Sequence, residues 1–413
     1  MRKQGKKMRE YSKLTVTEKA EKSIKNGHPW VYGEEVLACD KAYENGMIVD
    51  VCSKKGKWLG SGFVNDNSKI RVRLISDNTN DKFDDAFWYR RLKYAVDYRK
   101  TVMPGKDFKC CRLIFGEADR FPGFTVDRFE NVLVVQILSL GIEKIKKTLI
   151  PGLVDILEKS GETIDCVYER NDVNVRRLEG LEEYKDYYTD GIRCNYQKTV
   201  RICENGIYFD VDFINGQKTG YFLDQKYNRS AVARIAGSKK VLDCFTHTGA
   251  FALNALIGGA AEVTAIDISD EAIQMTKNNA QINGVYEKIE YIRADVFDYL
   301  TEAVKAGKSD YDFIILDPPA FTKSRSTVKD AYRGYKEINM KAMRLLPRGG
   351  YLATCSCSHF MPPNMFCKML HDAAIDAKVN LRQIEARQQS PDHPILMGVP
   401  ETEYLKFYLF QVV

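Results

Sequence analysis

The sequence predicts an α/β protein with a doubly wound, Rossmann-like parallel sheet in its C-terminal half, preceded by a small β-rich domain and a central α+β domain. First, its 413 residues exceed the roughly 250–300 at which a single core stops growing. Second, strand-like and helix-like segments alternate regularly from about residue 200 onward, which is typical of βαβ units. Third, the earlier segments are short and irregular. We therefore expect three domains, spanning residues 1–75, 76–195 and 196–413.

The first two domains are predicted from short apolar runs between Gly, Asn and Lys. These runs predict strands at residues 47–51, 58–64 and 70–75, typical of a small β barrel or sheet. The central segment predicts helices at 84–98 and 144–159 and strands at 124–126, 132–138 and 166–169. Residues 181–195 are charged and rich in turn formers, so we expect a linker there.

The third domain shows the clearest periodicity. Strands are predicted at residues 241–245, 263–266, 289–292, 313–316, 351–355, 381–386 and 404–413. Helices are predicted at residues 249–256, 270–283, 296–305, 330–346 and 363–377. Two strand-like runs at the end, which read as a hairpin, are what class I methyltransferases add to such a sheet.

Composition favours an ordinary globular enzyme, and the charge distribution leaves contact with nucleic acid open. Hydrophobic residues make up 44% and charged residues 29% of the chain. No apolar run approaches the ~20 residues needed to cross a bilayer, and the basic N-terminus lacks the apolar core of a secretory signal. We expect a cytoplasmic protein without a membrane partner. Lysine and arginine outnumber acidic residues by nine to three in residues 1–25, which indicates either phosphate contact or a solvated tail.

The 11 cysteines do not indicate a disulfide framework or a metal site. Their number is odd, their spacing is scattered, and no Cys-x-x-Cys pair occurs. No cluster has the spacing of metal ligands, so no metal is expected. Most of these thiols should be small buried side chains.

The loop after the first strand of the third domain predicts the cofactor. It offers one glycine, Gly249, rather than a G-x-G-x-x-G motif, and a pyrophosphate needs that glycine-lined approach. NAD and FAD are therefore disfavoured. S-adenosylmethionine carries no phosphate, and a carboxylate with one glycine turn suffices for it. We expect Asp243 to bind its amino group and Gly249 to let the backbone come close.

Carboxylates follow the next two strands as well. Asp267 is expected to accept both ribose hydroxyls, and Asp295, flanked by Val296, to reach the adenine amino group. Each aspartate could alternatively be a helix cap or a turn residue. Three carboxylates at three successive strand ends favour the cofactor. Neighbouring residues expected in the same site are Phe245, Thr246 and Ile268.

The fourth strand ends in Asp317-Pro318-Pro319-Ala320-Phe321. Two prolines stiffen the backbone and hold the carboxylate at the strand end. An Asp-Pro-Pro-x-aromatic pattern places a hydrogen-bonding group and a ring against a flipped base. We therefore expect Pro318, Pro319 and Phe321 to contact the substrate, the alternative being a simple strand-ending turn. Methylation of an exocyclic amine would use the same geometry.

The fifth strand ends in Thr354-Cys355-Ser356-Cys357-Ser358-His359 and indicates the reaction. Carbon 5 of cytosine is a poor nucleophile until a thiolate adds at carbon 6. We expect Cys357 to be that nucleophile, Cys355 to pack in the interior, and Asp317 to stabilise the proton on N3. His359 lies beside this site and either contacts RNA or is structural.

Several motifs together carry a family resemblance that spans nearly the whole chain. They are Gly27–Tyr32, Gly116–Asp119, Pro122–Arg128, Glu169–Val173, Gly216–Gln225, Arg333–Asn339 and Asp392–Pro394. In these motifs the chain resembles the RlmI-type bacterial 23S ribosomal RNA cytosine-5 methyltransferases, which carry an N-terminal PUA domain. It departs from the family pattern at Ala320, where the family usually has lysine, and at Cys355 and His359.

The resemblance implies a PUA RNA-binding domain, a central domain and a class I methyltransferase domain. It implies Cys357 as the catalytic cysteine with Asp317 as its partner. It also implies that the segment 216–225 covers S-adenosylmethionine, through Lys218, Thr219, Gly220, Phe222, Asp224 and Gln225. The expected partner is 23S ribosomal RNA, naked or in an assembly intermediate. The sequence leaves a homodimer open.

Three other functions remain as alternatives. An RNA or DNA N-methyltransferase would use the Asp317-Pro318-Pro319 site with a merely structural Cys357. A non-catalytic RNA-binding assembly factor would have lost affinity for the cofactor. A small-molecule methyltransferase would not need the PUA-like domain or the basic N-terminus.

Overall fold

The computed structural model describes residues 10–307 and 310–413 as two compact units. The first unit runs up to Val200 and adds Val211–Tyr221 and Pro394–Thr402. The second unit contains Arg201–Asp210, Phe222–His393 and Glu403–Val413. Five basic residues of the expected N-terminal arm lie outside the described residues: Arg2, Lys3, Lys6, Lys7 and Arg9.

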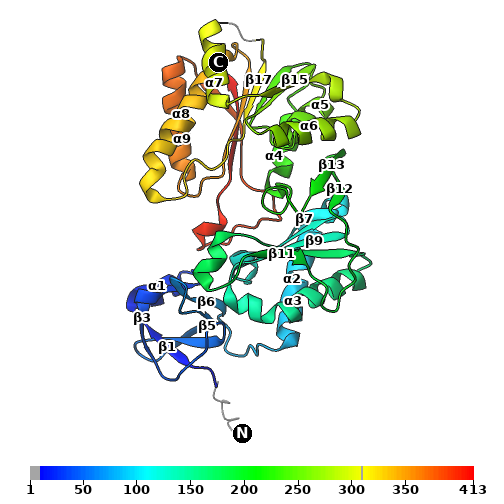
Figure 1. Ribbon diagram of the computed structural model, residues 1–413. Helices are drawn as coiled ribbons and strands as arrows, with labels where there is room; N and C mark the ends of the chain where they lie inside the picture. The colour runs from blue at the N-terminus through cyan, green and yellow to red at the C-terminus, as the bar shows by residue number, and fades with distance from the viewer. Residues whose placement is uncertain (1–9, 308–309) are drawn as a thin grey trace. The chain divides into compact units, whose positions relative to one another are not determined.

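The first unit begins with a six-stranded sheet in the order β2-β6-β5-β4-β1-β3 (Figure 1). Its elements are β1 (Lys13–Val16), α1 (Glu18–Lys25), β2 (Trp30–Tyr32), β3 (Val36–Cys39), β4 (Ile48–Ser53), β5 (Trp58–Val64) and β6 (Ile70–Ser76). Alternate apolar residues such as Leu14, Val31, Val49 and Val72 are fully buried in one core, as expected for strands that bury one face. The predicted β-rich domain is confirmed.

A second sheet of the same unit has five strands in the order β11-β10-β9-β8-β7. Its elements are α2 (Asp85–Val102), β7 (Cys110–Phe115), β8 (Phe124–Phe129), β9 (Val132–Ile137), α3 (Leu140–Lys159), β10 (Cys166–Asn171) and β11 (Tyr184–Tyr187). Strand β11 pairs antiparallel with β10. The prediction of a linker at 181–195 is therefore wrong in part, because the charged Tyr184–Tyr187 segment forms an edge strand, where polar side chains face solvent.

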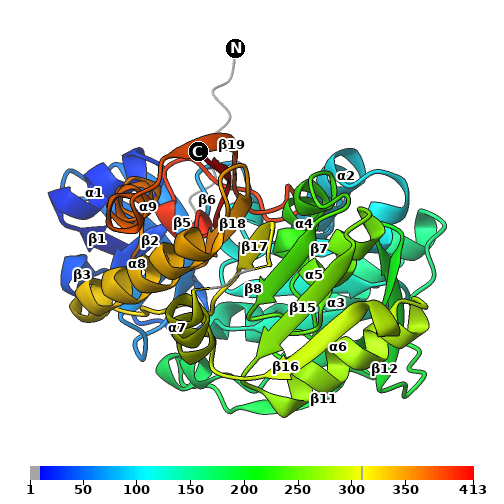
Figure 2. The same cartoon turned by 90° about the horizontal axis from the view of Figure 1, so that it is seen from above.

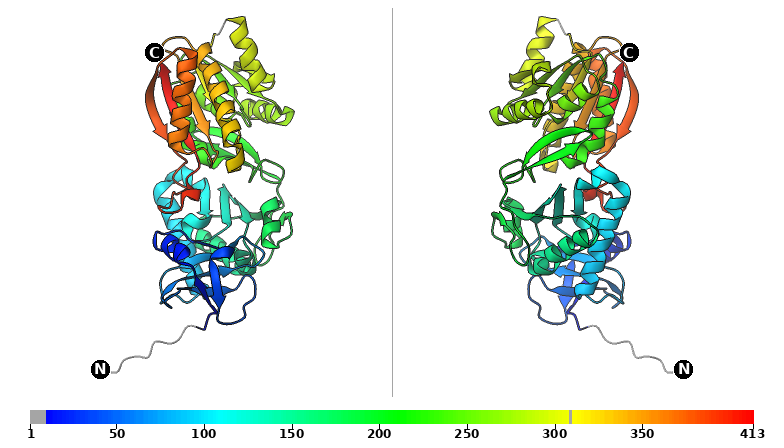
Figure 3. Two further views of the ribbon diagram at one scale, coloured as in Figure 1. Left: turned by 90° about the vertical axis from the view of Figure 1, so that its left-hand side faces the viewer. Right: turned by 90° about the vertical axis from the view of Figure 1, so that its right-hand side faces the viewer.

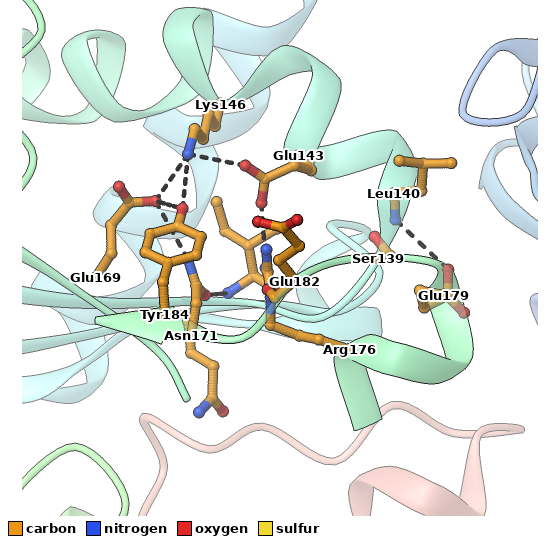
Figure 4. Close-up of polar contacts among 12 residues, drawn as sticks. Ser139, Leu140, Glu143, Lys146, Glu169, Asn171, Arg176, Glu179, Glu182 and Tyr184 are labelled. Carbon is orange, nitrogen blue, oxygen red and sulfur yellow. Dashed lines mark hydrogen bonds and ion pairs between the residues drawn. The ribbon is translucent and has the colours of Figure 1, made fainter. Parts of the chain in front are cut away.

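Charged side chains, buried or partly buried, hold this second sheet together (Figure 4), and Glu179 connects it to the first sheet. The ammonium of Lys146 lies 2.8 Å from Glu143, 3.1 Å from Glu169 and 2.7 Å from the Tyr184 hydroxyl. Glu179, which is 2% exposed, accepts hydrogen bonds from two residues of the first sheet, Asn65 at 2.9 Å and Arg73 at 2.6 Å. Its carboxylate therefore ties the two sheets into one unit.

The second unit is built on a seven-stranded sheet in the order β16-β15-β14-β17-β18-β20-β19. The strands are β14 (Lys240–Cys244), β15 (Glu262–Asp267), β16 (Ile289–Arg293), β17 (Phe313–Leu316), β18 (Tyr351–Ser356), β19 (Leu381–Arg387) and β20 (Lys406–Val412). The first five are parallel, and β20 runs antiparallel to both β18 and β19. Figure 3 shows this C-terminal pair, in orange-red and red, on one side of the unit. The predicted doubly wound sheet with a terminal hairpin is confirmed.

Helices cover both faces of this sheet. They are α4 (Lys226–Ala233), α5 (Ala250–Ile257), α6 (Asp270–Ile282), α7 (Val296–Ala306), α8 (Val328–Leu345) and α9 (Pro363–Ala377). Figure 2 shows α5 and α6 on one face and α7 and α8 on the other. Side-chain caps help to set the helix starts, because Ser269 accepts from the Ala272 amide at 3.3 Å and begins α6. A separate hairpin, β12 (Thr199–Glu204) with β13 (Ile207–Asp212), precedes the sheet.

The sequence and the structure agree most closely in the second unit. The predicted strand 313–316 and the predicted helix 363–377 have the observed bounds. The elements missed are the short ones, including α1, β1–β3, β7 and the β12–β13 hairpin. Within the described ranges, no helix is long and apolar enough to cross a membrane.

We expect that replacing Glu179 with alanine lowers the free energy of unfolding of the first unit by about 3 kcal/mol, because it removes the nearer carboxylate of Arg73, at 2.6 Å, and leaves only that of Glu117 at 3.8 Å. Although burial alone would raise it, the Arg73 charge and the hydrogen bonds hold the pKa of Glu179 below its usual value. The stabilisation that Glu179 provides is therefore present at neutral pH and is lost as the pH falls into the acid range.

Urea titration followed by tryptophan fluorescence measures this loss, since all 3 tryptophans of the chain (Trp30, Trp58 and Trp88) belong to the first unit. Glu182→Ala, at an exposed position shortly after Glu179, is the matched control and should change stability by less than about 0.5 kcal/mol. Equal losses in the two variants would contradict the role given to Glu179.

Candidate active site

The parallel strands place the predicted site residues along one edge of the sheet. Cys244 of β14 pairs with Ile266 of β15 on one side and with Leu316 of β17 on the other, and Leu316 pairs with Thr354 of β18. The residues one position further along the chain are Asp267, Phe245, Asp317 and Cys355. The carboxyl ends of these strands therefore bring together residues that are far apart in the sequence, as in other open α/β sheets.

The loop between β14 and α5 has an unusual backbone. Phe245, His247 and Gly249 have positive φ angles of 63°, 53° and 77°. Such conformations are costly for residues with side chains and cluster at ligand sites. A Cβ atom at Gly249 would lie 2.6 Å from the Cγ2 atom of Thr276. A side chain at this position would collide with Thr276, so the glycine lets the loop pack closely against α6.

Asp243 lies beneath this loop and is 1% exposed. Its Oδ2 atom accepts hydrogen bonds from the Thr246 hydroxyl at 2.6 Å and the Ala252 amide at 3.0 Å. Burial, with a smaller contribution from the charges of Asp317 and Asp267, raises the pKa of Asp243 to about 7, although its two hydrogen bonds act in the opposite direction. A positively charged ligand at this position would remove that electrostatic cost.

Asp267 and Asp295 organise turns. Asp267 accepts from the amides of His247 and Ser269, both at 3.0 Å. Asp295 caps α7 and accepts from the Phe297 amide at 2.7 Å. The capping role that the sequence left open for Asp295 is therefore present, and its contact with a cofactor stays a prediction.

The two apolar residues predicted beside these carboxylates differ in exposure. Ile268 is 63% exposed, which is unusual for an isoleucine and leaves its side chain available to cover a ligand. Val296 is 3% exposed and belongs to the hydrophobic core. A ligand could therefore contact its backbone but not its side chain.

The short helical turn Leu223–Gln225 and its preceding residue lie at the same edge of the sheet. This segment contains three of the predicted cofactor residues, Phe222, Asp224 and Gln225. The Phe222 ring lies 5.0 Å from that of His247. Gln225 donates to Asp317 at 3.0 Å, and Tyr404 donates to Asp224 at 2.6 Å. The structure thus brings these three predicted residues to the strand ends, and it adds a contact with Asp317 that the sequence did not suggest.

The other three residues predicted from that segment belong to the first unit. Thr219 donates to the buried carboxylate of Asp127 at 2.6 Å. Gly220 has a φ angle of 116°, a conformation reserved for glycine. Lys218 has a φ angle of 52°. Their roles toward the cofactor stay predictions.

Asp317 has the properties of a proton donor near neutral pH. Burial, with a smaller contribution from the negative charge of Asp224, raises its pKa to about 6. The positive charge of Arg229 and hydrogen bonds from Cys355 and Gln225 act in the opposite direction. A carboxyl group with a pKa this close to neutrality can exchange a proton with a substrate.

The two candidate cysteines lie in different surroundings. Cys355, within β18, has no exposed surface, and burial followed by the charge of Asp317 raises its pKa well above the usual value. Cys357 follows the end of β18 and is partly exposed. A thiolate forms more readily where it is solvated or beside a cation. Of the two, only Cys357 has such surroundings.

The predicted substrate residues are partly covered. Pro318 is buried, while Pro319 and His359 are exposed. The half-buried ring of Phe321 packs 4.5 Å from the Tyr335 ring, so only part of it is available to stack on a base. The Tyr335 hydroxyl lies 2.8 Å from the Ser358 hydroxyl, next to Cys357. All four residues stay predictions as substrate contacts.

Sequence reasoning missed Lys406, the first residue of β20, and Tyr404, two residues before it. Tyr404 contacts Asp224, and Lys406 donates to the carbonyl oxygens of Ser358 and Tyr404 at 2.7 and 2.8 Å. The sequence signal that could have pointed to Lys406 is a lysine inside the largely apolar run Tyr404–Val413. Within the described part of the chain, no three His, Cys, Asp or Glu side chains are grouped so that they could hold a metal ion.

A cavity of about 280 Å³ lies in the first unit. Its lining includes three cationic side chains, Lys25, Lys57 and Arg120, together with His28 and Trp58. Lys25 pairs with Glu21 at 2.6 Å and Arg120 with Asp77 at 3.6 Å. Cationic and aromatic side chains around one hollow are typical of sites that bind single-stranded nucleic acid.

Comparison with known families and proteins agrees with this organisation. Residues 176–411 match the family described as S-adenosylmethionine-dependent methyltransferase, and residues 14–77 match a PUA-like domain. Ribosomal RNA large subunit methyltransferase I of Klebsiella pneumoniae is 38% identical over 405 residues, which cover 98% of this chain and 99% of that protein. The protein of the same name from Escherichia coli O139:H28 is 38% identical over 402 residues, or 97% of this chain and 99% of that protein.

Solved structures support the same fold. A Streptococcus mutans protein assigned as an S-adenosylmethionine-dependent methyltransferase matches with a TM-score of 0.80 and 22% identity, over 97% of this chain and all of that one. A methyltransferase solved in complex with S-adenosylhomocysteine (SAH) matches with a TM-score of 0.82 and 22% identity over the same shares.

We expect the affinity for SAH to weaken about tenfold between pH 8 and pH 6. With the pKa of Asp243 at about 7, its carboxylate is mostly ionised at pH 8 and mostly protonated at pH 6, and only the ionised form attracts the ligand's ammonium group. Isothermal titration calorimetry across this range measures the effect.

Asp243→Asn should remove this pH dependence and bind SAH at pH 8 no more tightly than the unmodified protein does at pH 6. Asp317→Asn is the control: it should keep the dependence but move its midpoint to lower pH, because Asp317 is one of the charges that raise the pKa of Asp243. The same pH dependence in Asp243→Asn and in the unmodified protein would exclude Asp243 as the titrating group.

Proposed function

The chain belongs to the family of S-adenosylmethionine-dependent methyltransferases with an N-terminal PUA-like domain, and we propose that it methylates carbon 5 of a cytosine in large-subunit (23S) ribosomal RNA. The relatives named for methylation of large-subunit ribosomal RNA align over 97–98% of the chain. The choice of carbon 5 rests on the chemistry of Asp317 and Cys357.

The cofactor edge of the sheet fits S-adenosylmethionine, which supplies a methyl group on a positively charged sulfur. Gly249, with a φ angle of 77°, lets the backbone of the turn come close to a ligand, and the charged side chains at this edge are carboxylates rather than cations. Asp243 would hold the amino group and Asp267 the ribose hydroxyls. Ile268, which is 63% exposed, would cover the adenine ring.

One observation carries the choice of reaction. Strands β17 and β18 are parallel neighbours in register, and they end in a carboxyl group with a pKa of about 6 and in a partly exposed cysteine. Transfer to an amine needs no nucleophilic thiol. Transfer to carbon 5 needs a thiolate on one side of the ring and a proton donor near N3.

The proposed reaction begins when the Cys357 thiolate adds to carbon 6 and forms an S–C6 bond. Asp317 donates its proton toward N3 as negative charge develops in the ring, so that carbon 5 becomes an enamine carbon. Bound S-adenosylmethionine would supply the methyl group that carbon 5, now nucleophilic, accepts. Loss of the carbon-5 proton to a base, return of the N3 proton to Asp317 and cleavage of the S–C6 bond then restore the aromatic ring, the carboxyl group and the thiolate.

Contacts with RNA outside the target base are proposed for the first unit. The cavity lined by Lys25, Lys57 and Trp58 combines charge with a ring on which a base can stack. Lys57 is exposed and is the simplest phosphate contact among these residues.

We expect Cys357→Ser to lower the rate of methyl transfer on the order of 10³-fold or more, because removing a nucleophile abolishes the covalent path. Transfer of labelled methyl groups to 23S ribosomal RNA that lacks its modifications measures the rate, and nucleoside analysis identifies the product. RNA that contains 5-fluorocytidine should form a covalent adduct with the unmodified protein, since the fluorine cannot leave as a proton does.

Cys355→Ser is the matched control. It changes the thiol two residues away and should retain activity within about tenfold and still form the adduct. Full activity of Cys357→Ser, or label on an exocyclic amine or on a purine, would rule out the carbon-5 reaction and favour the N-methyltransferase.

We also expect Lys57→Gln to weaken binding of ribosomal RNA and to reduce its salt dependence. Each lost phosphate contact lowers the slope of log K against log salt concentration by about 0.7 for a single strand. Filter binding between low and physiological salt measures the slope. Lys147→Gln, at an exposed position on α3 outside the cavity, should leave it unchanged, and an unchanged slope in Lys57→Gln would exclude this phosphate contact.

A further inference from the structure

A buried lysine lies beside the proposed nucleophile. Lys406 is the first residue of β20 and pairs with Ser356 of β18, the residue before Cys357. Its side chain is 3% exposed. Lysine is almost never fully buried without a partner, so its position at this point of the sheet calls for an explanation.

The ammonium of Lys406 is held close to the backbone of Cys357. It donates to the Ser358 carbonyl at 2.7 Å and to the Tyr404 carbonyl at 2.8 Å. An ammonium group has three hydrogens, and these bonds use two. The bond to Ser358 fixes the carbonyl of the residue that follows Cys357, just beyond the end of β18.

The charge of Lys406 is not compensated by an ion pair. Among the described residues, no carboxylate lies within 4.0 Å of its ammonium, and its two acceptors are neutral carbonyls. A buried charge without a counter-charge costs several kcal/mol. The nearby groups that can carry negative charge are Glu403, which accepts from Gln388 at 2.8 Å, and Cys357.

We infer that Lys406 is a positioning residue whose ammonium stabilises the Cys357 thiolate while its hydrogen bond to Ser358 orients the cysteine. This inference rests on the proposed function, in which Cys357 is the nucleophile. When the pair forms, the proton of the Cys357 thiol leaves to solvent, and the ammonium of Lys406 keeps its own. The product is a buried cation beside an anion, which is the arrangement that activates cysteines in other enzymes.

The ionisation of Lys406 agrees with this arrangement. Burial lowers its pKa to about 8, and a negative charge on Cys357 acts in the opposite direction. The other titratable groups around the pair are Tyr335 on α8 and Cys355 on β18, both of which have raised pKa values because they are buried. Tyr335 and Cys355 stay neutral near pH 7, so that Lys406 supplies the cation that faces Cys357.

The test compares the pH dependence of Cys357 alkylation in three variants of the full chain. Iodoacetamide reacts with thiolates, and peptide mass spectrometry follows each cysteine separately. Lys406→Gln can still donate to both carbonyls but carries no charge, Lys406→Arg keeps the charge, and Lys406→Met removes both. We expect the midpoint of Cys357 alkylation to rise by about one pH unit or more in Lys406→Gln and Lys406→Met. In Lys406→Arg it should rise by less than half a unit.

Two controls accompany this measurement. The exposed Cys39 should alkylate with the same midpoint in every protein, and SAH affinity should match that of the unmodified protein, which shows that the second unit is folded. If Lys406→Met does not fold, Lys406→Gln alone decides the question. An unchanged Cys357 midpoint in a folded Lys406→Gln variant would overturn the inference.

The measurement uses neither RNA nor methyl transfer, so it can fail independently of the proposed function. If methylation occurred on an amine while the midpoint still shifted, the function would be wrong and the cysteine–lysine pair correct. If the product were 5-methylcytosine and the midpoint did not shift, the function would stand without a role for Lys406.

Discussion

The in-register pairing of β14 with β15 and β17 is the constraint on which the site depends. Parallel strands that start together also end together, so Asp243, Asp267 and Asp317 gather at one edge although the chain separates them widely. Burial disfavours ionisation of these carboxyl groups and the like charges nearby add to the effect, so that the pKa values of Asp243 and Asp317 rise to about 7 and about 6. The fold therefore creates an excess of potential negative charge, and a cationic cofactor is the ligand that this excess favours.

The antiparallel strand β20 brings the opposite charge. Its pairing with β18 carries Lys406 to the carbonyl of Ser358, the residue after Cys357. Tyr404, two residues before Lys406, holds Asp224 by a 2.6 Å hydrogen bond. Gln225, the residue that follows Asp224, donates a hydrogen bond to Asp317. One short segment of chain thus supports both the cysteine and the carboxyl group, and it keeps the cation on the side of the thiol and away from the carboxylates.

The alternation of strands and helices made the parallel sheet and its strand-end carboxylates predictable, because βαβ connections fix both direction and neighbours. The partners of an antiparallel strand depend on register, which the sequence of the apolar run Tyr404–Val413 does not reveal. The contact of Lys406 with Ser358 could therefore not be foreseen. The edge strand at Tyr184–Tyr187 was read as linker for a related reason, since edge strands tolerate the same charged residues as loops. The capping bond of Asp295 was foreseen only as an alternative, because caps and ligand contacts use the same residue types.

The sheet also explains how two cysteines separated by one serine acquire different chemistry. Side chains two positions apart in a continuous strand point to the same face, and equal surroundings would give the two thiols similar acidity. Strand β18 ends at Ser356, so Cys355 stays in the ladder against Asp317, whose negative charge opposes ionisation of the thiol. Cys357 leaves the ladder at the point where β20 supplies an ammonium group. Because β18 ends between the two cysteines and β20 begins at Lys406, the Cys355 thiol stays protonated, whereas Cys357 has the surroundings of a nucleophile.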